Sequence, residues 1–433
     1  MTSRDVVRRA GSGLAGVSAI YLASRILPAV LSLLSIKIFY AELGPVEFGR
    51  YVILNSLVLM GANVGSTWLA QSVLRYRSQY TSEPEQAVHE KALQVGAVGS
   101  ALIGCAIAAV FLAIRGASVL ATVAVGAALS SLLWYSVLAV AAQADMKPLR
   151  FLVAESMRSG GAFAVAVGLM SAGFTNAYIP VAALCIGNIA GILVYRWRSV
   201  PSGVIASGAA RTELVRYARY GVPMIVWMLV SVLINTADRF IVEGLLGEEQ
   251  LGVYAAITDL SYKTAIVILM PLGIAFHPVV MKAWNDGDAA AAYRSVRQAI
   301  AATFVAGSVL LVGFAAGAPA LQRFATGAVV GDGTAMVVLG AAAAILWQLG
   351  VVIQKPLEMH DRTRVLSALA AVGWLAQVAV LVAFLPRVGV VAASAGLALA
   401  SAVYVVLVAT ASMRLAPRQA TGEGVAFHSR SDT

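Results

Sequence analysis

The sequence LGPVEFGRY at residues 43–51 returns as LGEEQLGVY at residues 246–254, with a leucine, two glycines and a tyrosine in register. Each copy lies in a short polar connection between two long apolar stretches. The two copies are therefore equivalent corners of two homologous halves of the chain. A membrane protein made of two such halves usually places its substrate site between them, so the repeat favours a transporter.

The composition is that of an integral membrane protein. Hydrophobic residues make up 60% of the 433 residues and charged residues only 12%, whereas charged residues form about 25% of a soluble domain. The apolar runs are continuous and long enough to cross the hydrocarbon layer as helices, without the alternation of barrel strands. We therefore expect an all-α polytopic membrane protein with twelve transmembrane helices in two six-helix lobes, related as parallel repeats.

The apolar runs also predict the domain boundaries. The expected spans are 14–40, 50–74, 90–114, 118–142, 151–172, 177–195, 218–243, 250–279, 296–318, 334–357, 365–385 and 389–412. They give an N-terminal lobe over 1–195, a cytoplasmic linker over 196–217, a C-terminal lobe over 218–413 and a disordered cytoplasmic tail over 414–433. The connections are all short, which leaves no room for a catalytic domain, and we expect the chain not to be an enzyme.

The basic residues predict the orientation in the cytoplasmic membrane. If the N-terminus is cytoplasmic, most of the 31 Lys and Arg fall in cytoplasmic connections. Only Arg50, Arg115, Arg239, Arg323 and Arg387 fall in connections on the outer side. Such a bias places both termini in the cytoplasm. The net charge of +10 therefore reflects topology, and no nucleic-acid partner is implied.

Short motifs indicate no cofactor and no metal. The glycines of residues 11–16 fit G-x-G-x-x-G, but they follow no strand and open a membrane helix, so dinucleotide binding fails its structural context. The four His are scattered through the chain, which argues against a zinc site. The G-x-x-x-G spacings at 61–65, 187–191 and 313–317 are typical of close helix packing, with a dimer interface as the alternative.

Ionisable residues inside the spans are the candidate site, because charge in the hydrocarbon layer is costly and is retained for function. Arg25 lies near the middle of the first span and has no acid within one turn of its own helix. We expect it to bind substrate. Glu155 and Arg158 are three residues apart, and Asp259 and Lys263 are four apart, so each pair can meet on one helix face.

Two readings of these pairs remain open. Arg158 and Lys263 can bind an anionic substrate while Glu155 and Asp259 act in coupling, or each pair neutralises itself and holds helices together. Asp238 next to Arg239 is expected at the outer end of its span, as an ion pair or as a cation site. Pro28 and Pro223 interrupt equivalent spans of the two halves and are candidate hinges beside a cavity.

These residues resemble a known family. Arg25, the corner at 42–51, the sequence YGVP at 220–223, Asp238-Arg239 and the second corner at 246–254 are similar to the Wzx-type oligosaccharide flippases. These belong to the multidrug/oligosaccharidyl-lipid/polysaccharide exporter superfamily. The resemblance implies a V-shaped carrier that flips an undecaprenyl-diphosphate-linked sugar between leaflets for surface polysaccharide or lipopolysaccharide synthesis.

The same resemblance sets the expected partners. They are the polyprenyl-diphosphate-linked glycan, membrane lipid and the glycan polymerase machinery, and we expect the carrier to be a monomer. A cation-coupled multidrug exporter of the same superfamily is the main alternative. A membrane glycan polymerase or ligase is the other, although such enzymes typically need a large outer loop.

The predicted topology can be tested with reporter fusions. A reporter at Gly247 should read as outside the cytoplasm and one at Gly203 as inside, because the basic residues hold their connections on the cytoplasmic side. The reverse reading at either site would contradict the orientation.

Overall fold

The computed structural model describes residues 3–80, 82–195, 207–360 and 362–415, and within them every regular element is a helix. Residues 196–206 of the expected linker and 416–433 of the expected tail lie outside the described residues. The elements are α1 (Ser3–Tyr76), η1 (Arg77–Gln79), α2 (Glu83–Ile114), α3 (Val119–Ala144), α4 (Pro148–Ser171), α5 (Tyr178–Tyr195), α6 (Ser207–Leu246), α7 (Glu248–Asn285), α8 (Ala289–Thr326), α9 (Gly333–Ile353), α10 (Lys355–Met359), α11 (Thr363–Val388) and α12 (Val391–Met413).

The two copies of the sequence repeat adopt the same backbone conformation. Gly44 breaks α1 with φ 72° and ψ 171°, and Gly247 separates α6 from α7 with φ 87° and ψ 174°. Both φ values lie in the region where glycine carries no steric cost. The repeat therefore encodes one turn used twice, and α1 consists of two rods that meet at Gly44.

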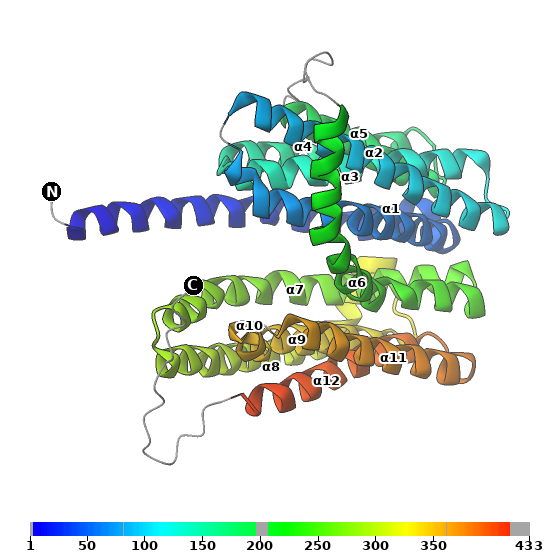
Figure 1. The fold of residues 1–433 in the computed structure, drawn as a ribbon. Coiled ribbons are helices and arrows are strands. Elements are labelled where there is room, and N and C mark those ends of the chain that lie inside the picture. Colours follow the sequence, from blue (N-terminus) through cyan, green and yellow to red (C-terminus); the bar gives the residue numbers. More distant parts are fainter. Residues whose placement is uncertain (1–2, 81, 196–206, 361, 416–433) are drawn as a thin grey trace.

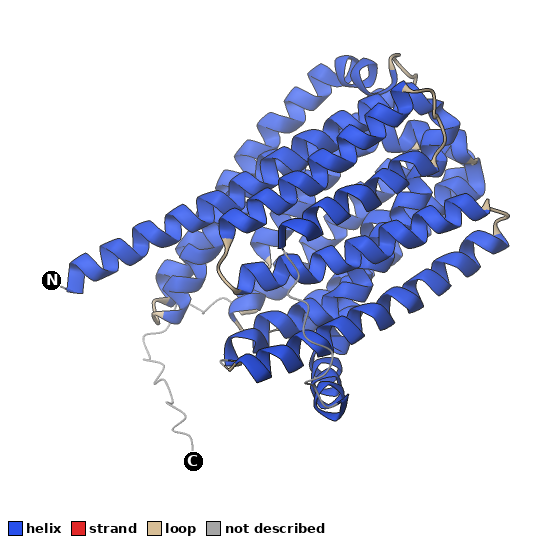
Figure 2. Ribbon diagram, turned by 90° about the horizontal axis from the view of Figure 1, so that it is seen from above, coloured by secondary structure: helices blue, strands red, loops and turns tan. Residues whose placement is uncertain are grey.

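Most helices run alongside one another, and their connections gather at the two ends of the bundle (Figure 2). One end carries Gly44, Gly247 and the connections 115–118, 172–177 and 327–332, and we call it the corner end. The opposite end carries the connections 77–82, 145–147, 286–288 and 360–362, and we call it the basic end. The charge pattern predicts that the basic end is cytoplasmic.

The helices form two groups. α1 to α5 lie together on one side and α7 to α12 on the other, with α6 crossing between them (Figure 1). The chain is helical from Ser207, inside the expected linker 196–217. Tyr217 in this part of α6 packs with Leu69 and Leu133 of the first group, whereas Ile234 further along packs with Leu366 of the second. α6 therefore belongs to both groups.

The two groups share a hydrophobic core only toward the corner end. Phe39, Phe48 and Val52 of α1 pack in one cluster with Tyr254 and Leu260 of α7. Toward the basic end the cluster around Leu69 and the cluster around Leu366 are separate. The contact between the groups is thus strongest where the two corners meet.

Two glycines make this contact possible. A Cβ atom on Gly49 would lie 2.0 Å from the carbonyl oxygen of Glu248, and one on Gly252 would lie 2.0 Å from that of Pro45. Gly49 and Gly252 are equivalent positions of the repeat, and so are Pro45 and Glu248. The corners therefore pack against each other in a two-fold manner, with Arg50 Nε donating to Glu248 across the contact at 2.7 Å.

The three G-x-x-x-G spacings of the sequence differ in what their glycines contact. A Cβ on Gly187 of α5 would lie 2.3 Å from the carbonyl oxygen of Arg158, and one on Gly61 of α1 would lie 2.4 Å from Leu129 of α3. These spacings serve close helix packing. Gly313 and Gly317 of α8 have no neighbouring atom within 4 Å of such a Cβ, so the packing expected at 313–317 is not formed.

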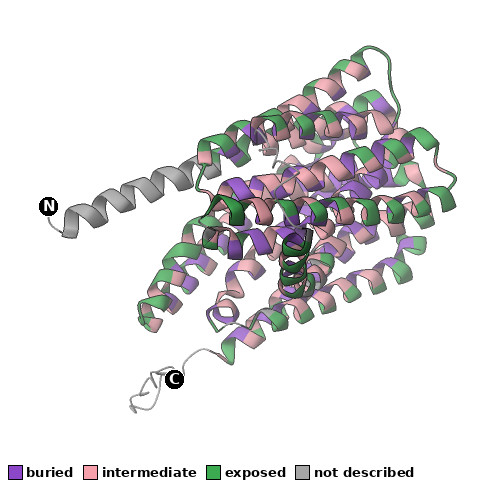
Figure 3. Ribbon diagram, turned by 45° about the horizontal axis from the view of Figure 1, so that its top comes forward, coloured by how far each residue is buried: buried purple, intermediate pink, exposed green. Residues whose placement is uncertain are grey.

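The outward surfaces of the bundle are apolar, as a lipid environment requires. On α2, Ile103 and Ile107 are 65% and 64% exposed, and on α8, Val309 and Val312 are 68% and 71% exposed. Exposed positions line the outward sides of the bundle and buried ones its interior (Figure 3). Nine helical segments of the described residues are long and apolar enough to cross a membrane, among them the 54-residue segment Ala23–Tyr76. The count of twelve spans remains a prediction.

The corner contact can be tested by adding one methyl group. Gly252→Ala would place a Cβ against backbone that cannot move aside, and such overpacking costs about 1–3 kcal/mol. We expect the corner end to open, so that a thiol introduced by Val52→Cys in the shared core reacts faster with a soluble maleimide.

The control for this experiment is Gly244→Ala, since a Cβ at Gly244 meets no atom within 4 Å. Both variants are made with Cys105→Ala and Cys185→Ala, which removes the two native thiols. Equal labelling rates in Gly252→Ala and Gly244→Ala would contradict a contact that depends on glycine.

Candidate functional site

Arg25 lies near the basic end of α1. Its guanidinium carbon is 5.7 Å from the ring centroid of Phe151, in the first turn of α4, which begins at Pro148. Arg25 therefore lies nearer the basic end of the bundle than its place in the middle of the expected span 14–40 suggests. The helix continues unbroken from Ser3 to the corner at Gly44, so the middle of the apolar run is not the middle of the bundle.

The side chain of Arg25 is exposed and forms no salt bridge with any described residue. It approaches the face of α4 on which Glu155 lies one turn beyond Phe151. A guanidinium in this position can offer several hydrogen-bond donors to an anion that reaches the space beside α1 and α4.

Glu155 and Arg158 form a buried ion pair deeper in the first helix group. Arg158 Nε donates to Glu155 at 3.3 Å, and the hydroxyl of Tyr135 on α3 donates to the same carboxylate at 2.5 Å. The guanidinium also lies 5.1 Å from the centroid of the Tyr135 ring. The side chain of Arg158 is 21% exposed and that of Glu155 is 7% exposed, so the pair is largely shielded from solvent.

Asp259 of α7 holds two cations in the second helix group. Arg239 Nη2 donates to both of its carboxylate oxygens at 2.9 Å, and Lys263 Nζ lies 3.3 Å away. Arg239 Nη1 also donates to Ser56 of α1 at 3.2 Å, so this cluster touches both groups. Lys263 is 39% exposed, whereas Arg239 is 12% exposed.

Asp238 is buried inside α6, which corrects its expected place at the outer surface. α6 continues to Leu246, two helical turns further, and Asp238 is 4% exposed. It does not pair with Arg239, because consecutive residues of a helix point about 100° apart. Instead Oδ2 accepts a hydrogen bond of 2.5 Å from the hydroxyl of Tyr254, and the buried Oδ1 has no partner among the described residues.

The candidate hinges lie within continuous helix. Pro28 is part of α1, and the described interruption of α1 is at Gly44 instead. Pro223 is part of α6, and its side chain lies outside the described residues. Close by, a Cβ on Gly221 would lie 2.2 Å from the carbonyl oxygen of Trp68, so α6 meets α1 at short range just before this proline.

A comparison with models of known protein families shows the family to which this chain belongs. The family model described as polysaccharide biosynthesis protein matches residues 43–328 of the chain. The chain belongs to the polysaccharide biosynthesis protein family. No curated protein matches its sequence.

Solved structures share the fold of this polysaccharide biosynthesis protein at low identity. An inward-facing multidrug resistance MATE family transporter of the MOP superfamily has a TM-score of 0.67 and 14% identity, over 91% of this chain and 98% of that one. The lipid II flippase MurJ in an inward closed conformation has a TM-score of 0.68 and 11% identity, over 91% and 87%. An outward-facing multidrug resistance MATE family transporter has a TM-score of 0.63 and 13% identity, over 92% of this chain and 94% of that one. The expected all-α fold of a multi-pass membrane protein is thereby confirmed.

The fold divides the predicted cations between two places. Arg158 lies on α4 and Arg25 lies beside α4, both in the first group, whereas Lys263 lies on α7 in the second. Sequence reasoning missed Arg239 as the main partner of Asp259, because it assigned Arg239 to an outer connection. The signal that could have found it is the unbroken apolar run on both sides of 238–239, which indicates that the helix continues. The described residues contain no group of three or more His, Cys, Asp or Glu that could hold a metal ion.

The Asp259 cluster of this polysaccharide biosynthesis protein should be essential to its stability. Asp259→Asn would leave Arg239 buried without a carboxylate, and loss of one partner of a buried pair costs about 3–5 kcal/mol. We expect a clearly lower melting temperature in detergent. Asp286→Asn, at an exposed position at the end of α7, is the control and should melt like the unmodified protein. Equal melting of both variants would contradict a structural role of the pair.

Proposed function

We propose that this protein flips an undecaprenyl-diphosphate-linked oligosaccharide across the cytoplasmic membrane for surface polysaccharide synthesis. Membership of the polysaccharide biosynthesis family supports a glycan as the substrate. The fold shared with a lipid II flippase supports a substrate that is linked to a lipid. The wider resemblance to Wzx-type flippases points the same way. The resident partners in this proposal are the lipid-linked glycan and the surrounding membrane lipid.

The observation that carries the proposal is that Arg25 is exposed and forms no salt bridge with any described residue. A diphosphate that enters the plane of the membrane loses hydration, and a cation without a carboxylate partner can replace that water with charge-assisted hydrogen bonds. Arg25 is exposed toward the basic end, where a substrate made in the cytoplasm would arrive. Arg158 and Lys263 are deeper cations that the substrate could meet next, once each is released from its acidic partner.

The lobes 1–195 and 218–413 are the proposed moving parts, with the segment 196–217 between them. The closed corner contact of Gly49 and Gly252 supports a gate at the outer side, since the groups share a core there and have separate cores toward the basic end. In the alternate state this contact would separate while the basic end closes. Pro28 and Pro223 then provide the bends of α1 and α6.

A cation-coupled multidrug exporter is the second candidate. The MATE transporters that share the fold are described as multidrug resistance proteins. The specific observation in its favour is Asp238, whose buried Oδ1 has no partner among the described residues and could take up a proton. Glu155 and Asp259 are further coupling candidates, although both are already paired.

The test of the first candidate is transport by Arg25 variants. In vesicles that contain a fluorescent polyprenyl-diphosphate oligosaccharide, Arg25→Ala should slow flipping by at least about tenfold, the effect of one lost charge-assisted hydrogen bond. Arg25→Lys should restore part of the rate, because lysine keeps the charge and lacks the planar fork. Melting temperature and expression should stay unchanged.

Arg323→Ala is the matched control, since Arg323 is an exposed arginine in the last turn of α8 at the corner end. It should flip at the normal rate. A normal rate in Arg25→Ala would contradict the diphosphate role of Arg25. No flipping of the glycolipid by the unmodified protein, together with export of cationic drugs, would favour the multidrug exporter instead.

A further inference from the structure

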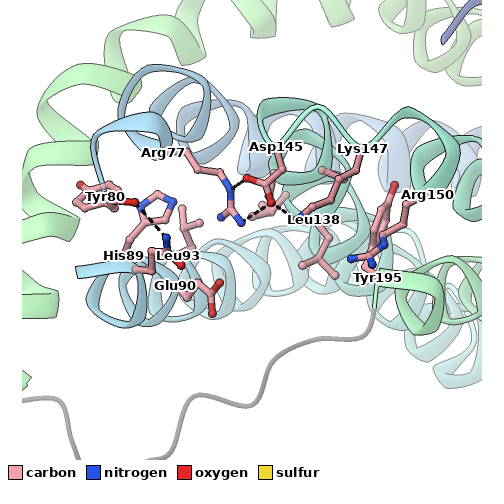
Figure 4. Close-up of a pocket in the computed structure, with 14 residues that line it drawn as sticks. Arg77, Tyr80, His89, Glu90, Leu93, Leu138, Asp145, Lys147, Arg150 and Tyr195 are labelled. Atoms are coloured by element: carbon pink, nitrogen blue, oxygen red, sulfur yellow. Dashed lines mark hydrogen bonds and ion pairs between the residues drawn. The ribbon is translucent and has the colours of Figure 1, made fainter. Parts of the chain in front are cut away.

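A large polar cavity lies inside the first helix group, apart from the space between the groups. It has a volume of about 750 Å³ and is lined by the basic ends of α2, α3 and α4 together with Arg77, Tyr80 and Tyr195. Arg77, Asp145 and Lys147 form its centre, with Arg150 and Tyr195 to one side and Tyr80 and His89 to the other (Figure 4). None of the predicted substrate residues lines it.

The cavity carries one surplus positive charge. Its lining has three cations, Arg77, Lys147 and Arg150, against the carboxylates of Glu90 and Asp145. Burial acts to raise the pKa of Asp145, but hydrogen bonds from Arg77 and Lys147 outweigh it and lower the pKa to about 2. Asp145 is therefore ionised at neutral pH and neutralises one cation.

Two groups of the lining are left for an occupant. Arg150 is exposed and forms no salt bridge with any described residue. His89 is 1% exposed, its Nδ1 is hydrogen-bonded to the hydroxyl of Tyr217, and its buried Nε2 has no partner among the described residues. A buried polar atom without a partner is costly, so an anion or its bound water in the cavity would complete the site.

A separate apolar groove lies further from the basic end, between α2, α3 and α5. It has a volume of about 440 Å³ and is bordered by Leu102 and Cys105 of α2, Ala127 and Trp134 of α3, and Ile189 of α5. It opens on the lipid-facing side of the bundle, where Leu102 is 66% exposed and Ile189 is 47% exposed.

One face of α3 forms the floor of both spaces. Ala127, Ser131 and Trp134 border the groove, and Leu138, Ala141 and Asp145 border the cavity, at the three- and four-residue spacing of one helix face. From Asp145 to Trp134, at the near edge of the groove, the helix rises about 17 Å, about half of the roughly 30 Å hydrocarbon layer. A polar cavity at this distance from an apolar groove matches the head group and acyl chain of a lipid of one leaflet.

We infer that α2, α3, α4 and α5 form a binding site for an anionic glycerophospholipid of the leaflet at the basic end. Its phosphate lies in the cavity at Arg150, and an acyl chain enters the groove beside Trp134. The single surplus charge of the lining matches the one negative charge of a phosphodiester such as phosphatidylglycerol, and falls short of a diphosphate. The site is independent of the proposed transport function.

The experiment uses the full-length, delipidated protein in detergent, with lipid binding measured by native mass spectrometry and by thermal shift. Phosphatidylglycerol should bind and stabilise more than phosphatidylethanolamine. Arg150→Gln should weaken the binding of phosphatidylglycerol by about tenfold, the effect of one lost charge-assisted hydrogen bond. Arg297→Gln, an exposed arginine of α8 outside the cavity, should bind it normally.

The groove is tested by Ala127→Trp. This substitution fills the groove at an exposed position and should also weaken the binding of phosphatidylglycerol. Val406→Trp, at an exposed position of α12, is its control. Melting of the lipid-free variants establishes that each is folded.

Several results would overturn the inference. Equal binding of the two phospholipids, or normal binding by Arg150→Gln, would remove the anionic site. Equal protection by free glycerol phosphate would mean that the groove takes no part. Tighter binding of a polyprenyl diphosphate than of phosphatidylglycerol, lost in Arg150→Gln, would assign the site to the transported lipid instead.

Discussion

The contact of the two glycine corners is the constraint on which the arrangement of the helix groups depends. Gly49 and Gly252 let the backbones of α1 and α7 approach so closely that a methyl group on either would overlap a carbonyl oxygen of the other corner. Between membrane helices, where the hydrophobic effect gives no net attraction, such close packing is a main source of affinity. The shared core of α1 and α7 forms around this contact.

The charged side chains inside the bundle are also arranged so that an energetic cost is limited. Most buried charges are paired within one helix group, as with Glu155 and Arg158 or with Asp259 and Arg239, because an unpaired charge in a low dielectric is costly. Arg25 and Arg150 form no salt bridge with any described residue, and both are exposed toward the basic end.

The polar cavity and the apolar groove beside α3 form a second surface, apart from the contact between the two groups. In the proposed transport cycle, the helices of the first group must also hold their place in the bilayer while the two groups move. A lipid held between α2, α3 and α5 would stiffen the first group without touching the corner contact. Such a site would couple the composition of the membrane to the stability of one moving part.

The sequence alone determined the helical membrane fold, the two corners and the pairing of Glu155 with Arg158 and of Asp259 with Lys263. These follow from local rules, since apolar length, glycine conformation and helix periodicity act within a few residues. Only the tertiary structure decided the depth of Arg25, the burial of Asp238 and the bond of Arg239 to Asp259, because each depends on which helices lie side by side. It also placed Gly49 against Gly252 and joined residues of five helices in one cavity, contacts that link segments far apart in the chain and leave no local pattern in the sequence.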